Sequence, residues 1–251
     1  MKKLVCFLLS STALCGYAAD PAHDNASHYT NPWGPSNPQN RAASGFAPWT
    51  FETYKAPTKG AAFEIDTANS AFAIPMAPGY DAAWISFTGD GQLDNGQQYH
   101  TELIFHAPGH STSGEPTHGF DLMALSPSVD SHYLNFGHQV LGLYLGQTSP
   151  KKYGFGLAIH NTLSDEHPDR WITLPTITFQ AGMSLKLDYI QWSAGAWQLR
   201  LHPSNGNAVV LTSSELGPTW NTTTGIDAVR LFTSQAIKNG HPLEWTHMTV
   251  N

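Results

Sequence analysis

Cysteine is missing from most of this chain. Both cysteines, Cys6 and Cys15, lie in the N-terminal stretch of the 251 residues, so the remainder has neither a disulfide nor a thiol nucleophile. Long apolar runs are also missing, because no segment after residue 14 approaches the length that spans a bilayer. Charged residues are only 12% of the chain, and no stretch of ten or more residues has amphipathic helical periodicity. These absences argue against a disulfide scaffold, a membrane-spanning helix and a helical bundle.

The N-terminus has the pattern of a secretory signal peptide. It reads MKKLVCFLLSSTALCGYAAD, in which two lysines precede a short apolar run and small residues follow. Cleavage is expected near Ala18 or Ala19. We therefore expect residues 1–19 to be removed and the mature protein to be secreted or periplasmic.

The charge balance is acidic. Without Lys2 and Lys3, ten basic residues face 19 acidic ones, which leaves a net charge of −9 with neutral histidines. Nucleic acid and anionic membrane surfaces are unfavourable partners for such a protein. The chain also carries 13 histidines, enough to make its charge sensitive to pH near 6 if they are exposed.

The organisation of the chain predicts a leader and one β domain. Residues 20–48 are rich in Asn, Pro, Ser and Ala and are expected to form an extended segment, with Trp33 as its anchor. Residues 49–251 alternate between short apolar runs and Gly, Pro, Asn and Asp turns, which favours an all-β sandwich or barrel. The expected strands are 61–65, 71–74, 82–87, 98–105, 119–125, 140–145, 154–160, 171–174, 176–179, 184–192, 197–202, 208–211, 227–232 and 244–250.

The clearest pattern is a β-hairpin over residues 184–202. Its two arms, SLKLDYIQW and AWQLRLH, alternate strictly between apolar and polar residues and are joined by a short glycine-containing turn. Leu185, Leu187 and Tyr189 are predicted on the core face with Trp197 and Leu199. The opposite face is available for function.

The order of the C-terminal pieces resembles the concanavalin A-like lectin and glucanase superfamily. The hairpin is followed by GIDAVRLFTS and by a closing strand, LEWTHMTV. The resemblance implies an antiparallel two-sheet jelly-roll sandwich. The superfamily includes lectins, binding modules, glycoside hydrolases and polysaccharide lyases, so the fold alone does not determine the function.

A second alternating strand, QYHTELIFH over residues 98–106, places His100, Glu102 and His106 on one face. Three interpretations remain open: a sugar-binding or catalytic face, a metal site, or a polar solvated face. The HTEL segment has a weak similarity to a strand of jelly-roll alginate lyases, which implies Glu102 as a catalytic group. In an enzyme, Glu102 would act with His100 and His160 as acid and base.

We expect the mature protein to recognise a polysaccharide or glycan on a concave sheet face, like a lectin. Aromatic rings stack on sugar rings while polar side chains bond the hydroxyls. A polysaccharide lyase or glycoside hydrolase of the same fold, and a structural envelope or matrix protein, are the alternatives. The predicted sugar-binding residues are Tyr144, His160, Asp188, Trp192, Arg200 and His202.

Metal binding has one sequence candidate. The loop GDGQLDNG over residues 89–96 could hold Ca²⁺ through Asp90, Asp94 and Asn95. A turn rich in Asp, Gly and Asn has the same composition without any ion, so both interpretations stay open.

Overall fold

The structure of the chain is a computed structural model. It describes residues 21–31, 33–34, 46–54, 63–74, 80–87, 93, 96–106, 118–123, 139–149, 152–159, 170–193, 196–216, 226–234 and 243–251. Over these residues helix is confined to η1 (Ala26–His28) and α1 (Ser213–Leu216). No helix in the described ranges is long and apolar enough to cross a membrane. The predicted signal peptide, residues 1–19, lies outside the described residues and stays a prediction.

The strands form two antiparallel sheets. The eight-stranded sheet has the order β13-β12-β11-β6-β15-β4-β3, with β1 paired to β15; the other sheet, of seven strands, has the order β10-β9-β8-β7-β14-β5-β2. Strands of the first are β1 (Ala22–Asn25), β3 (Glu64–Asp66), β4 (Ala71–Ile74), β6 (Gln98–Phe105), β11 (Met183–Ser193), β12 (Ala196–Pro203), β13 (Val209–Thr212) and β15 (Leu243–Val250). Strands of the second are β2 (Thr50–Tyr54), β5 (Tyr80–Ser86), β7 (His118–Met123), β8 (Gln139–Ser149), β9 (Lys152–Ile159), β10 (Arg170–Thr178) and β14 (Ala228–Ser234).

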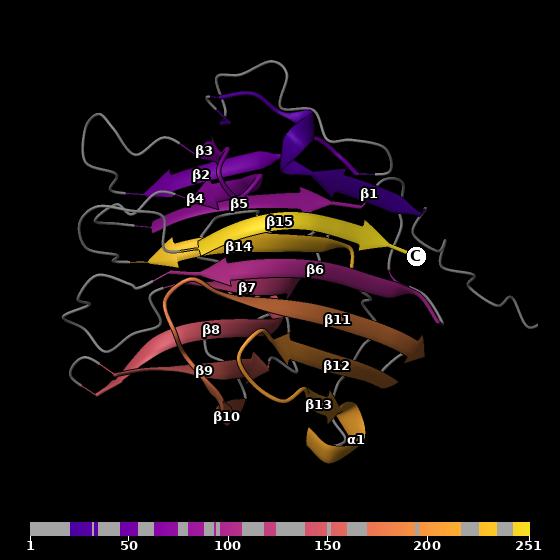
Figure 1. Cartoon of the computed structure of the whole chain (residues 1–251). Helices are drawn as coiled ribbons and strands as arrows, with labels where there is room; N and C mark the ends of the chain where they lie inside the picture. The colour runs from indigo at the N-terminus through magenta and orange to yellow at the C-terminus, as the bar shows by residue number, and fades with distance from the viewer. Residues whose placement is uncertain are drawn as a thin grey trace, which may run out of the picture.

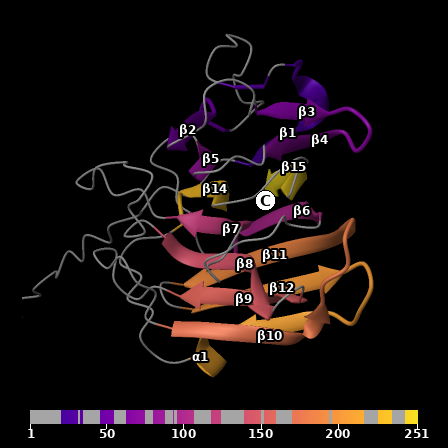
Figure 2. The ribbon, with the colours of Figure 1, turned by 90° about the vertical axis from the view of Figure 1, so that its left-hand side faces the viewer.

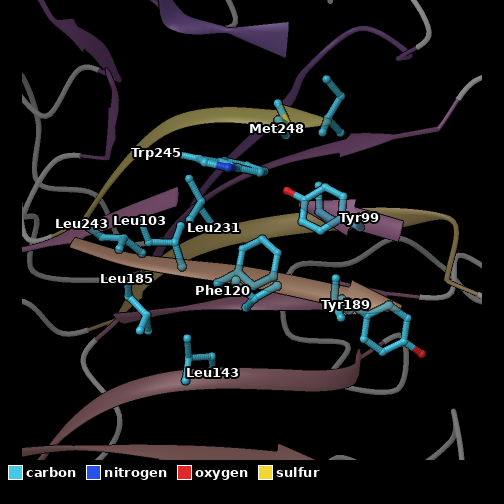
Figure 3. Packing of buried hydrophobic residues seen from close by; sticks show 14 of the residues in the cluster. Tyr99, Leu103, Phe120, Leu143, Leu185, Tyr189, Leu231, Leu243, Trp245 and Met248 are labelled. Carbon is cyan, nitrogen blue, oxygen red and sulfur yellow. The ribbon is translucent and has the colours of Figure 1, made fainter. Parts of the chain in front are cut away.

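The two sheets lie face to face. In Figure 1, β15 and β6 lie in front of β14 and β7, and Figure 2 shows the same two layers after a quarter turn. The main core fills the space between them. Figure 3 shows how Trp245 and Leu103 from one sheet meet Phe120 and Leu231 from the other, all with no exposed surface. The predicted all-β sandwich is confirmed.

Alternation explains which side chains reach this core. Strand β6 alternates between half-buried and buried residues along its whole length, and in β11 and β12 the predicted core residues Leu187, Tyr189 and Leu199 are fully buried. The β11–β12 hairpin pairs as predicted, with Asp188 opposite Arg200. Because successive side chains point to opposite faces, the same pattern leaves the polar residues on the outside of the sheet.

The N-terminal segment is tied to the sandwich. Strand β1 pairs with β15, so it extends the eight-stranded sheet. Trp33 is fully buried, and its ring centroid lies 5.0 Å from those of Trp49 and Phe51 and 4.8 Å from that of Phe72. The expected anchor is therefore present, whereas β1 and β2 were not among the predicted strands.

Strand β10 differs from its prediction. The sequence indicates two short strands, 171–174 and 176–179, but the structure has one strand with a register irregularity between Thr173 and Thr178. Pro175 lies inside this irregular stretch. Because β10 is the edge strand of its sheet, the missing N–H of proline does not interrupt the sheet interior.

Candidate functional site

The structure places the predicted sugar-binding residues on two different sheets. Tyr144 belongs to β8 in the seven-stranded sheet, whereas Asp188, Arg200 and His202 belong to β11 and β12 in the eight-stranded sheet. Both groups point away from the inter-sheet core, so they lie on opposite outer faces. The structure therefore does not bring Tyr144 together with the others in one site. His160 lies outside the described residues.

On the eight-stranded sheet, three of the sequence-predicted residues meet. Nδ1 of His100 bonds Oδ1 of Asp188, and Nε2 of His202 lies 3.6 Å from Oδ2 of the same carboxylate. Glu102 stands between Lys186 and His247 in the strand register. This face is a polar, histidine-rich surface.

Trp192 lies apart from that polar group. It is four residues beyond Asp188 along β11, which corresponds to about 13 Å in a strand. Its side chain is 48% exposed. Among the described residues we find no aromatic ring packed against it.

The outer face of the seven-stranded sheet carries a second apolar cluster. Ala82, Tyr144, Ala158 and Phe232 are buried, yet they form a group separate from the main core. The strand register explains this grouping, because Tyr144 is opposite Gly119 and Gly156, and Phe232 is opposite Gly119 and Ala82. Small residues thus surround two large rings on one sheet face.

Three rings on this face form a series that we call the aromatic ladder: Trp171, Tyr144 and Phe232. The ring centroids of Trp171 and Tyr144 are 5.4 Å apart, and those of Tyr144 and Phe232 are 5.3 Å apart. The buried guanidinium of Arg230 lies over Phe232, 5.6 Å from its centroid. Such distances are favourable for aromatic pairs and for a cation over a ring.

Gly119 of β7 makes room for the ladder. A Cβ atom at this position would lie 2.8 Å from Cδ1 of Tyr144, 3.0 Å from Cε1 of Phe232 and 2.6 Å from the carbonyl oxygen of Leu143. These distances are shorter than van der Waals contact, so only glycine lets the two rings settle this close to the sheet.

Trp171 is the exposed member of the ladder. Its side chain is 54% exposed, whereas Tyr144 and Phe232 are 4% and 3% exposed. One side of the indole is held by Tyr144, and the exposed Thr173 follows on the same strand face. An aromatic ring that packs against a buried neighbour and has a hydroxyl group on the same strand face offers a partly preorganised surface for stacking against a sugar ring.

Sequence reasoning identified Tyr144 but not Trp171 or Phe232. The signal for Trp171 was local: alternation in β10 places Trp171 and Thr173 on one face and Ile172 and Leu174 on the other. What was missing was the pairing of β10 with β9, which brings Trp171 opposite Ala158.

No metal centre is found where the chain is described. No group of three or more His, Cys, Asp or Glu in the described ranges could hold an ion. Within the described ranges, His100 and Glu102 therefore have no third residue that would complete a metal site with them. Asp90, Asp94 and Asn95 lie outside the described residues, so their calcium site stays a prediction.

Comparison with known proteins relates this chain to lectins through structure alone. No protein-family model and no curated protein matches it. The winged bean acidic lectin in complex with methyl-α-D-galactose superposes with a TM-score of 0.51 at 9% identity, covering 92% of this chain and 98% of the lectin. The metal-free exoplasmic/lumenal domain of VIP36 gives a TM-score of 0.49 at 11% identity, covering 90% of this chain and 89% of that domain.

These comparisons bear on the fold. The sequence similarity to alginate lyases is not shown by them. The two antiparallel sheets and the superposition on the winged bean lectin agree with the architecture expected from the sequence. The chain has the concanavalin A-like jelly-roll fold.

Proposed function

We propose that this protein is a carbohydrate-binding, lectin-like protein that holds a polysaccharide or glycan against the exposed face of Trp171. The observation that carries the proposal is the aromatic ladder, in which the half-exposed Trp171 packs against the buried ring of Tyr144, which itself packs against the buried Phe232. The lectin fold of the chain supports the same class of function without identifying the sugar.

The physical basis is preorganisation. Binding a sugar costs free energy for each side chain that must become ordered. Trp171 is already held by Tyr144, and Tyr144 in turn lies between Trp171 and Phe232. An apolar ring face and a neighbouring hydroxyl, that of Thr173, supply the combination of stacking and hydrogen bonding that sugars require.

The experiment is native affinity electrophoresis of the mature protein through gels containing neutral polysaccharides. The chain supplies a matched pair of variants, because Trp171 and Trp192 are 54% and 48% exposed and lie on opposite sheets. Trp171→Ala is expected to weaken binding about tenfold or more, equivalent to ~1.4 kcal/mol. Trp192→Ala should bind like the wild type. Loss of binding in Trp192→Ala alone would instead move the site to the eight-stranded sheet.

An enzyme of the same fold is a second candidate, favoured by one arrangement. Glu102 is opposite Lys186 in the strand register and Asp188 is opposite His100, so the two residues are diagonal neighbours on one face, with backbones about 7–8 Å apart. Glycoside hydrolysis uses two carboxylates that face one site, and these two residues share one sheet face.

Glu102→Gln tests this enzyme. A cleared zone around the protein in polysaccharide gels would reveal cleavage, and the variant should then lose turnover about 10²-fold or more while keeping its affinity. Retardation without clearing in wild-type gels, or unchanged clearing in the variant, contradicts a catalytic role for Glu102.

Secretion and calcium binding are also part of the proposal. The N-terminal pattern supports export of the mature chain after cleavage near Ala18 or Ala19. The loop over residues 89–96 supplies oxygen ligands of the type that Ca²⁺ prefers, from Asp90, Asp94 and Asn95.

A further inference from the structure

The outer face of the eight-stranded sheet presents two adjacent rows of polar side chains, which we call the histidine face. The first row crosses the strands from Arg200 on β12 to Asp188 on β11 and His100 on β6, and then to Thr249 on β15 and His23 on β1. Residues that are opposite each other on neighbouring antiparallel strands have Cβ atoms about 4.5–5.5 Å apart. The row is therefore a continuous line of side chains.

The second row runs beside the first. It passes from His202 on β12 through Lys186 and Glu102 to His247 on β15. A register irregularity in β15 between Trp245 and His247 precedes its last member. Because residues on one face of a strand repeat every second position, the two rows are about 6.5–7 Å apart.

Contacts link the rows into one group. The carboxylate of Asp188 contacts His100 through one oxygen and His202 through the other. The rings of His100 and His247 lie with their centroids 5.3 Å apart, and the ring planes are tilted by 38°. Two imidazoles thus contact one carboxylate, and a third, that of His247, packs against the ring of His100.

The charge of this face depends on pH. With neutral histidines, Lys186 and Arg200 balance Asp188 and Glu102, so the two rows carry no net charge. Protonation of His23, His100, His202 and His247 adds four positive charges and leaves a cationic face. The chain as a whole carries a formal charge of −7 with neutral histidines, so the rest of the molecule opposes an anion and the local cations must attract it.

Other titratable groups border the rows and moderate this change. On the β3–β4 side, Glu244 is paired with His106 at 3.2 Å. On the β1 side, the buried Asp24 lies 3.5 Å from His28. Further charged groups on neighbouring elements are Glu64 and Asp66 on β3 and Glu215 on α1.

The pKa of His247 reflects the neighbouring positive charges. Burial lowers the pKa of His247, with repulsion from His100, His23 and Lys186 acting in the same direction and Glu102 opposing them. An anion bound across the rows relieves that repulsion, so binding and protonation favour each other.

We propose that the histidine face binds an anionic polysaccharide under mildly acidic conditions and releases it at neutral pH. The ligand is a sugar polymer and not a membrane, because the rows are polar or charged from Arg200 to His23, and the exposed Val210, opposite Arg200 on the edge strand β13, is a single apolar side chain and not an apolar face that could insert between lipids. The surface is distinct from the aromatic ladder, which lies on the other sheet, so this inference does not depend on the proposed function.

The test is fluorescence anisotropy with labelled dextran sulfate, using labelled dextran as the uncharged polymer of the same backbone. Wild-type protein should bind dextran sulfate about tenfold or more tighter at about pH 5 than at about pH 7.5. The variant His100→Gln/His202→Gln/His247→Gln should lose most of that gain. Trp171→Ala should keep it, which separates failure of this inference from failure of the proposed function.

A matched pair of single variants controls for overall charge. His202 and Lys152 are both exposed, and each loses one cation on substitution by Gln at acidic pH, but Lys152 lies on β9 of the other sheet. His202→Gln should weaken acidic binding about two- to threefold, and Lys152→Gln should not. If the triple variant does not fold, His202→Gln still tests the histidine face.

Three results contradict the inference. Equal binding by His202→Gln, Lys152→Gln and wild type would indicate attraction by total charge. Dextran bound as tightly as dextran sulfate would indicate a neutral-sugar site. Acid-dependent binding to phosphatidylserine vesicles without binding to dextran sulfate would make the face a membrane surface.

Discussion

At the scale of single residues, His247 couples the histidine face to protein stability. Burial and neighbouring cations lower its pKa below the ordinary 6.5, so between that value and the lowered one the unfolded chain binds the proton more readily than the folded chain. The stability that the neutral imidazole contributes is therefore present above pH 6.5 and is lost as pH falls through the folded pKa.

His247→Gln tests this coupling. The variant should lose less stability than the wild type as pH falls from about 7 to about 5, because Gln does not titrate. Urea unfolding at a series of pH values measures the difference. Parallel curves for the two proteins would show that protonation of His247 is not linked to folding. Burial raises the pKa values of Asp24 and Glu244, so their protonation adds stability as pH falls. This contribution is the same in the wild type and the variant, and it cancels when the two curves are compared.

At the scale of secondary-structure elements, the close packing of β7, β8 and β14 supports the aromatic ladder. Tyr144 and Phe232 come from the strands on either side of β7, and Gly119 lies between them. Their rings can occupy this position only because β7 offers no side chain there. The geometry of Trp171 on β10 therefore depends on a residue three strands away in the sheet.

Gly119→Ala should disturb both stability and binding. The added methyl group meets a carbonyl oxygen at 2.6 Å, and overpacking of this kind costs roughly 1–3 kcal/mol. Displacement of Tyr144 should also weaken sugar binding. Gly206→Ala is the control, because its Cβ would meet Pro203 at an ordinary 3.5 Å. Thermal unfolding of both variants measures the difference, and an undisturbed Gly119→Ala would mean that the rings are free to move.

At the scale of the whole molecule, the N-terminal segment contributes to the sandwich it precedes. Strand β1 supplies the edge position of the first row on the histidine face through His23. Trp33 fills a cage of rings from β2, β4 and the residue preceding β3. The segment therefore contributes to the packing of both sheets.

Two substitutions of Trp33 separate packing from hydrogen bonding. Trp33→Ala should destabilise the protein by about 3–5 kcal/mol through loss of buried ring contacts. Trp33→Phe should cost much less, because within the described part of the chain the indole N–H has no hydrogen-bond partner. Urea unfolding distinguishes them. Equal losses in the two variants would indicate that the indole N–H carries the stabilisation.

Features that depend on local alternation were predicted correctly from the sequence. The grouping of residues into one site was predicted wrongly, because it depends on the pairing of strands that are distant in the chain. The two faces of β6, β11 and β12 followed from their own residues, and so did the hairpin that joins Asp188 to Arg200. Tyr144 was grouped with Asp188 as an aromatic ring that stacks on a sugar beside polar groups that bond its hydroxyls. Which sheet each strand joins depends on contacts between residues far apart in the chain, and alternation carries no information about it.

The same reason explains why Trp171 was missed. Its exposure and its outward direction are local, but its neighbour Tyr144 is 27 positions away in the sequence and comes from β8, two strands across the sheet. Only the order β10-β9-β8 brings the two rings together over the small residues of β9.

The most direct test of the account is the ratio of two dissociation constants for a neutral polysaccharide that retards the wild type. Trp171→Ala and Trp192→Ala remove indoles of similar exposure from opposite faces of the sandwich. We expect the dissociation constant to rise about tenfold or more for Trp171→Ala and to stay within about twofold of wild type for Trp192→Ala. Equal constants in the two variants, or a rise in Trp192→Ala alone, would contradict a sugar site on the aromatic ladder.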